Sequence, residues 1–155
     1  SVLPVGNYIG SMMEEEAPVA VEKYGLASFE MKVQGIDRTL VDKVFALCDY
    51  YLLNNGKKHS RHIYDIYKLL PLIPINDQYK LLMEEVRLVR KEASLCLSAQ
   101  DGIDISALLK EIIEKAVYKA DYENLTERLL EEKIDYETAI GALEKLAVLY
   151  AKEYL

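Results

Sequence analysis

Apolar and polar residues alternate with two different periods along this chain. In Phe29–Gly35 apolar residues recur at every second position, a period that indicates a half-buried strand. From Thr39 onward they recur every three to four positions, which is the period of an amphipathic helix. We therefore predict a short strand-containing segment near the N-terminus and helices over the rest of the chain.

Turn-forming residues divide the helical part into segments. The first helix begins after Thr39, a suitable N-cap, and stops at Asn54–Gly56. Ser60 can cap a second helix, which Pro71 and Pro74 end. Four later helices are expected at 76–97, 105–119, 122–132 and from 136 onward, and the N-terminal segment is expected to hold a strand at 1–5 and a short helix at 8–16.

These elements predict a mainly α fold, an α+β remnant in which short N-terminal strands precede a bundle of about six helices. The 155 residues suffice to bury a core of their own. We place a boundary after residue 36, because the apolar period changes there. Residues 1–36 then form the strand-containing part, and residues 37–155 form a C-terminal helical domain.

Composition limits which partners this chain can have. A net charge of -7 repels nucleic acid and anionic membranes, so phosphate chemistry would require a local basic patch. No apolar run reaches the roughly 18 residues that a membrane span requires. Cys48 and Cys96 lie in apolar helical contexts, which is typical of reduced thiols. We expect a cytoplasmic protein without a membrane partner.

Basic residues gather around the junction of the first two predicted helices. Lys43 falls at the edge of an apolar face, where an ammonium is partly desolvated and can point into a cleft. On the next helix Arg61, Asp65 and Lys68 share one stripe. Further basic residues lie in and after the intervening loop: Lys57, Lys58, His59 and His62. Such a cluster can hold a polyphosphate, since the cations neutralise its oxygens while the carboxylate orients a basic group or assists a metal.

Each of these residues also has a purely structural interpretation. An Arg–Asp pair four residues apart is most often a surface ion pair worth a few tenths of a kcal/mol. A lysine beside an apolar face usually lays its stem over the core. His59 and His62 form an H-x-x-H pattern without an evident third ligand, so we expect them to be solvated and predict no metal site. The many tyrosines, at helical spacing, are expected to pack in the core.

Two stretches, Val33–Leu47 and Ser60–Leu69, resemble the AbiEii/AbiGii family of nucleotidyltransferase-like toxins from type IV toxin–antitoxin and abortive-infection systems. Members of that family have a strand leading into an Arg-Thr…Lys helix, followed by a helix with the pattern R-x-x-x-D-x-x-D. Here Lys43 matches the lysine and Arg61–Asp65 begins the second pattern, but Lys68 stands where the closing aspartate belongs. The resemblance continues to the C-terminus with falling specificity.

The resemblance implies roles for these residues. Lys43 and Asp65 would be catalytic, and Arg61 and Lys68 would bind substrate. The intact protein would use a nucleoside triphosphate and Mg²⁺ to transfer a nucleotide to an RNA or protein acceptor, with tRNA as one candidate and a cognate antitoxin as a candidate partner. A non-catalytic helical interaction module, which binds an antitoxin or a second copy of itself, is the alternative.

One part of the family pattern is not evident in this sequence. Family members carry a Gly-Ser followed about ten residues later by a D-x-D or D-x-E pair on a strand, and those carboxylates hold the magnesium ions. Gly10-Ser11 is present, but no such acidic pair follows it, and Glu14–Glu16 come too early. We therefore assign no metal ligand and expect this chain to be the C-terminal part of a nucleotidyltransferase, with 1–36 as a remnant of its core. Isolated, it should be inactive as a transferase.

Overall fold

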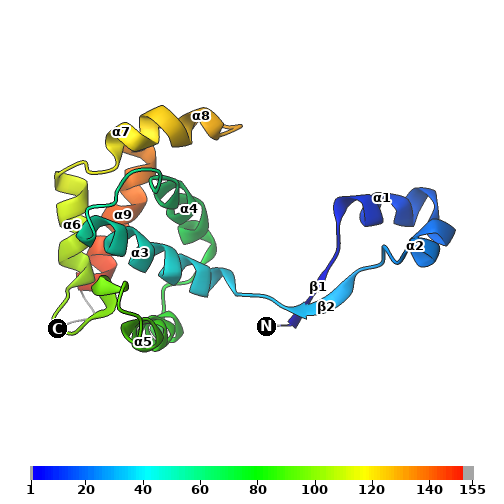
Figure 1. Cartoon of the computed structure of the whole chain (residues 1–155), viewed down its shortest axis with the longest axis horizontal. Helices are drawn as coiled ribbons and strands as arrows, with labels where there is room; N and C mark the ends of the chain where they lie inside the picture. Colours follow the sequence, from blue (N-terminus) through cyan, green and yellow to red (C-terminus); the bar gives the residue numbers. More distant parts are fainter. Residues whose placement is uncertain (1, 152–155) are drawn as a thin grey trace. The chain divides into compact units, whose positions relative to one another are not determined.

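The computed structural model describes residues 2–151 and divides the chain into two compact units, Ser1–Gly35 and Ile36–Leu155 (Figure 1). The first unit contains a pair of short strands, and the second is built from helices. The prediction of a mainly α fold with short N-terminal strands is therefore confirmed. Within the described residues, no helix combines the length and the apolar character that crossing a membrane requires.

The first unit consists of two paired strands and two short helices in the segment that connects them. Strands β1 (Val2–Val5) and β2 (Phe29–Lys32) run antiparallel, with the first residue of one opposite the last residue of the other. Helices α1 (Tyr8–Glu16) and α2 (Pro18–Tyr24) lie between them in sequence. Strand β2 ends three residues before the predicted Gly35, and α2 was not predicted from the apolar period.

The Gly10-Ser11 pair lies in the first turn of α1. Asn7 caps this helix, because its side-chain oxygen accepts a hydrogen bond from the Gly10 backbone N–H at 2.7 Å. A Cβ atom at Gly10 would lie only 2.4 Å from the carbonyl oxygen of Leu26. Only glycine therefore allows this close approach of α1 to the segment that follows α2.

The second unit contains six helical segments among its described residues. Their bounds are α3 (Ile36–Leu52), α4 (Arg61–Leu69), α5 (Asp77–Lys91), α6 (Ile105–Glu114), the continuous run of α7 (Lys119–Asp121), the π-helical turn η3 (Tyr122–Thr126) and α8 (Glu127–Leu129), and finally α9 (Tyr136–Ala151). Two 3₁₀ turns connect them, η1 (Leu70–Leu72) and η2 (Leu97–Ala99).

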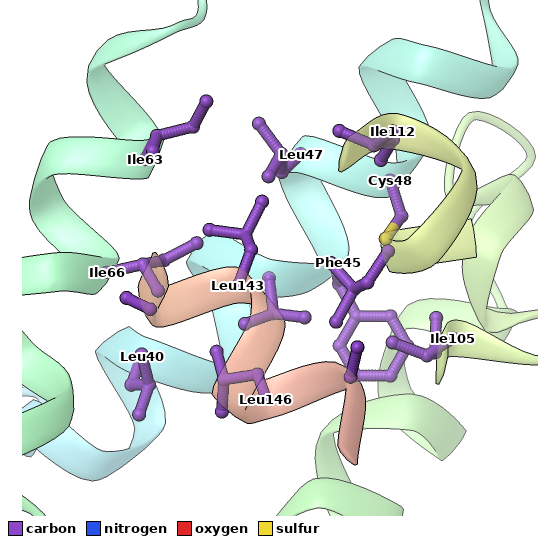
Figure 2. Close-up of a cluster of buried hydrophobic side chains, with 14 of the residues drawn as sticks. Leu40, Phe45, Leu47, Cys48, Ile63, Ile66, Ile105, Ile112, Leu143 and Leu146 are labelled. Atoms are coloured by element: carbon purple, nitrogen blue, oxygen red, sulfur yellow. The ribbon is translucent and has the colours of Figure 1, made fainter. Parts of the chain in front are cut away.

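The core of this unit lies between α3, α4, α6 and α9. Helix α6 packs along α9, and α4 packs against both α3 and α9. Figure 2 shows apolar side chains from all four helices pointing toward one another. Those less than 3% exposed include Leu40, Phe45, Leu47, Cys48, Ile63, Ile66, Ile105, Ile112, Leu143 and Leu146. Each such leucine, isoleucine or phenylalanine stabilises the fold by about 1.5–3 kcal/mol through burial, so this cluster holds α3 and α4 in fixed register.

Tertiary contacts end two helices earlier than the periodicity predicted. Helix α5 stops at Lys91, and the side-chain amide of Gln100 donates a hydrogen bond to the Lys91 carbonyl at 3.2 Å. Helix α6 stops at Glu114, and Ala116 has a left-handed φ of 47°. The chain then turns so that the buried Tyr118 hydroxyl donates to the carbonyl of Leu47 at 2.7 Å.

Two predicted N-caps are wrong. Helix α3 begins at Ile36, so Thr39 lies inside its first turn rather than before it. Ser60 does precede α4, but its side chain makes no capping hydrogen bond. Instead its buried hydroxyl lies 2.7 Å from the hydroxyl of Thr126. The cause is tertiary, because Thr126 comes from η3, far along the chain.

Candidate functional site

An ion pair joins α3 to α4 at the predicted site. The Lys43 ammonium donates a hydrogen bond to Asp65 Oδ2 at 2.7 Å. The two side chains are 29% and 33% exposed, respectively, so the pair lies at the edge of the core and remains accessible to solvent. The cation on one helix and the carboxylate on the next therefore converge, as the proposed assignment to a triphosphate site requires.

His62 approaches the same oxygen of Asp65 as Lys43 does. Its Nδ1 is 3.7 Å from Asp65 Oδ2, too long for a direct hydrogen bond but close enough for electrostatic attraction when the imidazole is protonated. Burial raises the pKa of Asp65, but the neighbouring His62 and the hydrogen bond from Lys43 outweigh it, so the pKa lies below its ordinary value. Asp65 is therefore ionised at neutral pH.

The two histidines are not the solvated pair expected from the sequence. His62 is only 7% exposed, and the rings of Tyr50 and His59 stack with centroids 3.5 Å apart. Burial, together with the nearby charges of His62 and Arg61, lowers the pKa of His59. His62 could have been assigned to the core from its spacing, because it lies beside Ile63 on the buried face of α4. The stacking of His59 on Tyr50 could not be predicted, because no local sequence pattern indicates it.

Arg61 and Lys68 do not join the Lys43–Asp65 pair. Arg61 is exposed and forms no ion pair with any residue in the range 2–151, Asp65 included. Lys68 pairs with Glu132 at 3.4 Å and lies over the ring of Tyr64. The structure therefore brings together two of the four predicted site residues, Lys43 and Asp65. Arg61 and Lys68, although on the same helix as Asp65, lie in other surroundings.

The loop before α4 is held by a residue that sequence reasoning did not single out. Asp121 accepts backbone hydrogen bonds from Lys58 at 2.8 Å and from Ser60 at 3.2 Å. Burial raises the pKa of Asp121, but these hydrogen bonds outweigh it and hold the pKa below its ordinary value. These two hydrogen bonds, which we call the Asp121 clamp, stabilise the backbone of Lys58, whose φ of 67° is left-handed. The clamp therefore ties the start of α4 to α7.

A second polar network, around Asp42 and Asp49 of α3, is structural. Asp49 is 5% exposed and accepts three hydrogen bonds, from the Ser98 backbone N–H, the Ser98 hydroxyl and the Arg90 guanidinium. Arg90 also pairs with Asp42 at 3.2 Å. The network ties α5 and η2 to α3, and both carboxylate oxygens of Asp49 are engaged within the protein.

The site does not fit a magnesium ion. Lys43 already neutralises Asp65, and magnesium sites in nucleotide-transfer enzymes use carboxylates that are available for coordination. Across residues 2–151, no three His, Cys, Asp or Glu side chains come together in a set that could hold a metal. The pair offers a fixed ammonium, which can bind an anionic oxygen.

Comparison with known proteins gives one match. A family model described as "Nucleotidyl transferase AbiEii toxin, Type IV TA system" matches residues 7–146, which is most of the chain. No curated protein and no solved structure matches it. The matched range includes Lys43, Asp65 and the clamp residue Asp121. The chain therefore belongs to the AbiEii family of nucleotidyltransferase toxins of type IV toxin–antitoxin systems.

Proposed function

We propose that Lys43 contacts the phosphates of a nucleoside triphosphate while a nucleotide is transferred to an RNA or protein acceptor. The supporting observation is the 2.7 Å contact between Lys43 and Asp65, in a chain whose family is named for nucleotidyl transfer. An ammonium has three N–H donors, and Asp65 engages one of them. The remaining donors are available to phosphate oxygens.

In this proposal Asp65 is a positioning residue. A lysine side chain has high conformational freedom, and the carboxylate limits it by holding the ammonium in one place. Because its pKa is lowered, Asp65 stays ionised and keeps this role throughout the neutral pH range. Arg61, exposed at the start of α4, would add a second cation for the phosphates or the acceptor. Lys68 would have to leave Glu132 before it could do the same.

We further propose that the magnesium ligands used by the family lie in a part of the parent protein outside this chain. The chain alone would then lack transferase activity. Incubating it with labelled triphosphates, magnesium and total tRNA tests this directly. Label transfer by the isolated chain would show that its own residues complete the active site.

The role of Lys43 is tested in the parent protein. We expect Lys43→Ala and Asp65→Ala each to lower transfer of label from a nucleoside triphosphate by at least about tenfold. A factor of this size corresponds to the loss of one charge-assisted hydrogen bond. Growth arrest on expression should weaken in parallel. Lys80→Ala is the matched control, because Lys80 also pairs with an aspartate, Asp77, but on α5 and at 3.8 Å.

Two outcomes separate this proposal from its alternative. Full activity of both Lys43→Ala and Asp65→Ala, with unchanged thermal stability, would contradict the assignment. Growth arrest by the isolated chain without any label transfer would instead favour the non-catalytic interaction module. Circular dichroism of each variant ensures that a loss of activity does not reflect unfolding.

A further inference from the structure

We propose that a second site, on the surface formed by α4 and the η3–α8 run, binds an acidic amphipathic helix of a partner protein. The site is a cavity of about 270 Å³. We call it the leucine cup, after its apolar lining residues Leu125, Leu129 and Leu130, beside Tyr64. Docking at the leucine cup does not require the transfer reaction proposed above.

The leucine cup exposes apolar side chains that the core does not use. Leu125 is 45% exposed and Leu129 is 84% exposed. They are four residues apart, so they lie on one face of the helical run. A π-helical turn, Tyr122–Thr126, precedes α8, and such turns are frequent at functional sites. Together the two leucines offer a small apolar surface to the side chains of a partner.

The two cations that line the leucine cup favour an acidic partner. Lys58 and Arg61 also line it, both are exposed, and neither forms an ion pair within the described part of the chain. The one lining carboxylate, Asp121, is already engaged by two backbone N–H groups. The chain as a whole carries a charge of -7, so two unpaired cations beside an apolar cavity are a local exception. They complement carboxylates on an incoming segment.

The geometry favours a helix over other ligands. The cavity is somewhat smaller than the roughly 300–1,000 Å³ typical of sites for whole small molecules, and is better matched to side chains inserted from a partner. Amphipathic helices present such anchors at i, i+3, i+4 and i+7 to an apolar groove. Single-stranded RNA would require aromatic stacking surfaces, but Lys68 already lies over the Tyr64 ring.

The leucine cup is also pre-organised. Asp121 fixes the backbone of Lys58 and Ser60, and the Ser60 hydroxyl is hydrogen-bonded to Thr126, which also lines the cavity. The loop that carries Lys58 is thus tied to the run that carries the leucines. Little ordering is required on binding, which favours affinity.

The test measures binding of fluorescent synthetic helices to the whole chain by anisotropy. The probe is an amphipathic peptide with leucines at i, i+3, i+4 and i+7 flanked by glutamates. Two reference peptides replace the glutamates by lysines or the leucines by alanines. An oligouridylate serves as the RNA arm, and sedimentation velocity reports self-association.

Two variants and two matched controls identify the surface. We expect Leu129→Ser to weaken binding of the glutamate–leucine peptide about tenfold. Lys58→Gln should weaken it several-fold and reduce its dependence on salt. Leu81→Ser, at a leucine that is 71% exposed on α5, and Lys110→Gln, at an exposed lysine of α6, should bind as the unmodified chain does.

Several results would overturn the proposal. Equal binding of the lysine-flanked peptide, no binding of any peptide, or equal effects of Leu129→Ser and Leu81→Ser would each do so. RNA binding that Lys58→Gln abolishes and Leu129→Ser leaves intact would assign the surface to nucleic acid. Self-association that Leu129→Ser abolishes would assign it to a second copy of the chain.

Discussion

The hydroxyl of Ser60 lies 2.7 Å from the hydroxyl of Thr126, in a buried contact between residues 66 positions apart. It joins the start of α4 to η3, directly beside the Asp121 clamp. Ser60 and Thr126 are only 1% and 6% exposed, so their hydroxyls depend on protein groups for hydrogen-bond partners. The position of α4, and with it that of Asp65, therefore depends on a contact with the distant η3 turn.

We expect Ser60→Ala and Thr126→Val each to lower the free energy of unfolding by about 1 kcal/mol, because each leaves one buried hydroxyl unpaired. The double variant should cost little more than either single one, since it removes both partners. Urea denaturation of the four proteins gives the coupling energy. Purely additive losses would show that the two hydroxyls do not stabilise each other.

The Lys43–Asp65 pair predicts a pH dependence of stability. The pKa of Asp65 in the folded chain lies below its ordinary value, so the pair stabilises the fold above the unfolded pKa and loses this effect as pH falls through the folded value. At pH 7 we expect Asp65→Asn to destabilise by about 1 kcal/mol, since the pair is only partly buried. The difference from the unmodified chain should begin to shrink as pH falls below about 4, and should vanish only below the lowered pKa of Asp65 in the folded chain.

Denaturation of both proteins between pH 7 and pH 3 provides the measurement. A destabilisation by Asp65→Asn that stays constant down to pH 3 would mean that packing, rather than charge, accounts for the effect. Lys43→Met should show the same pH dependence, because it removes the other member of the pair.

Asp49 should be among the most sensitive charged positions of the second unit. It is 5% exposed and accepts hydrogen bonds from Ser98 and Arg90. Asp49→Asn leaves the Arg90 guanidinium with only the more exposed carboxylate of Asp42, so we expect a loss of about 3 kcal/mol in the free energy of unfolding. The control is Asp101→Asn, at an aspartate that is 87% exposed and pairs with Lys91. Guanidinium denaturation should detect no change for it.

Ala116 provides a test of backbone strain. Its φ of 47° is left-handed, just beyond the end of α6, where glycine is the preferred residue. We expect Ala116→Gly to raise the free energy of unfolding by about 0.5–1 kcal/mol, because relief of strain exceeds the added freedom of the unfolded chain. Ala107→Gly, at an exposed position inside α6, should instead lower it by up to about 1 kcal/mol. Thermal unfolding distinguishes these opposite signs.

Most of the helical architecture could be predicted from the sequence because burial and turn chemistry are local signals. The apolar period located α3, α4, α6 and α9, and Asn76, where a helix was predicted to begin, caps α5 through its side-chain oxygen. The early ends of α5 and α6 could not be predicted in this way. Gln100 and Tyr118, which lie at those ends, act through contacts with other segments.

The candidate site likewise could be predicted only in part from the sequence. Periodicity alone placed Lys43 at the edge of an apolar face, because helical geometry determines the angle between neighbouring side chains. Which cation meets Asp65 was decided by the packing of α3 against α4, which brings Lys43 from 22 residues away. Arg61, the neighbour along the helix, turns instead toward the leucine cup. The sequence determines which side chains share one face of a helix. Only the packing of helices around a common core determines which side chain of another helix they contact.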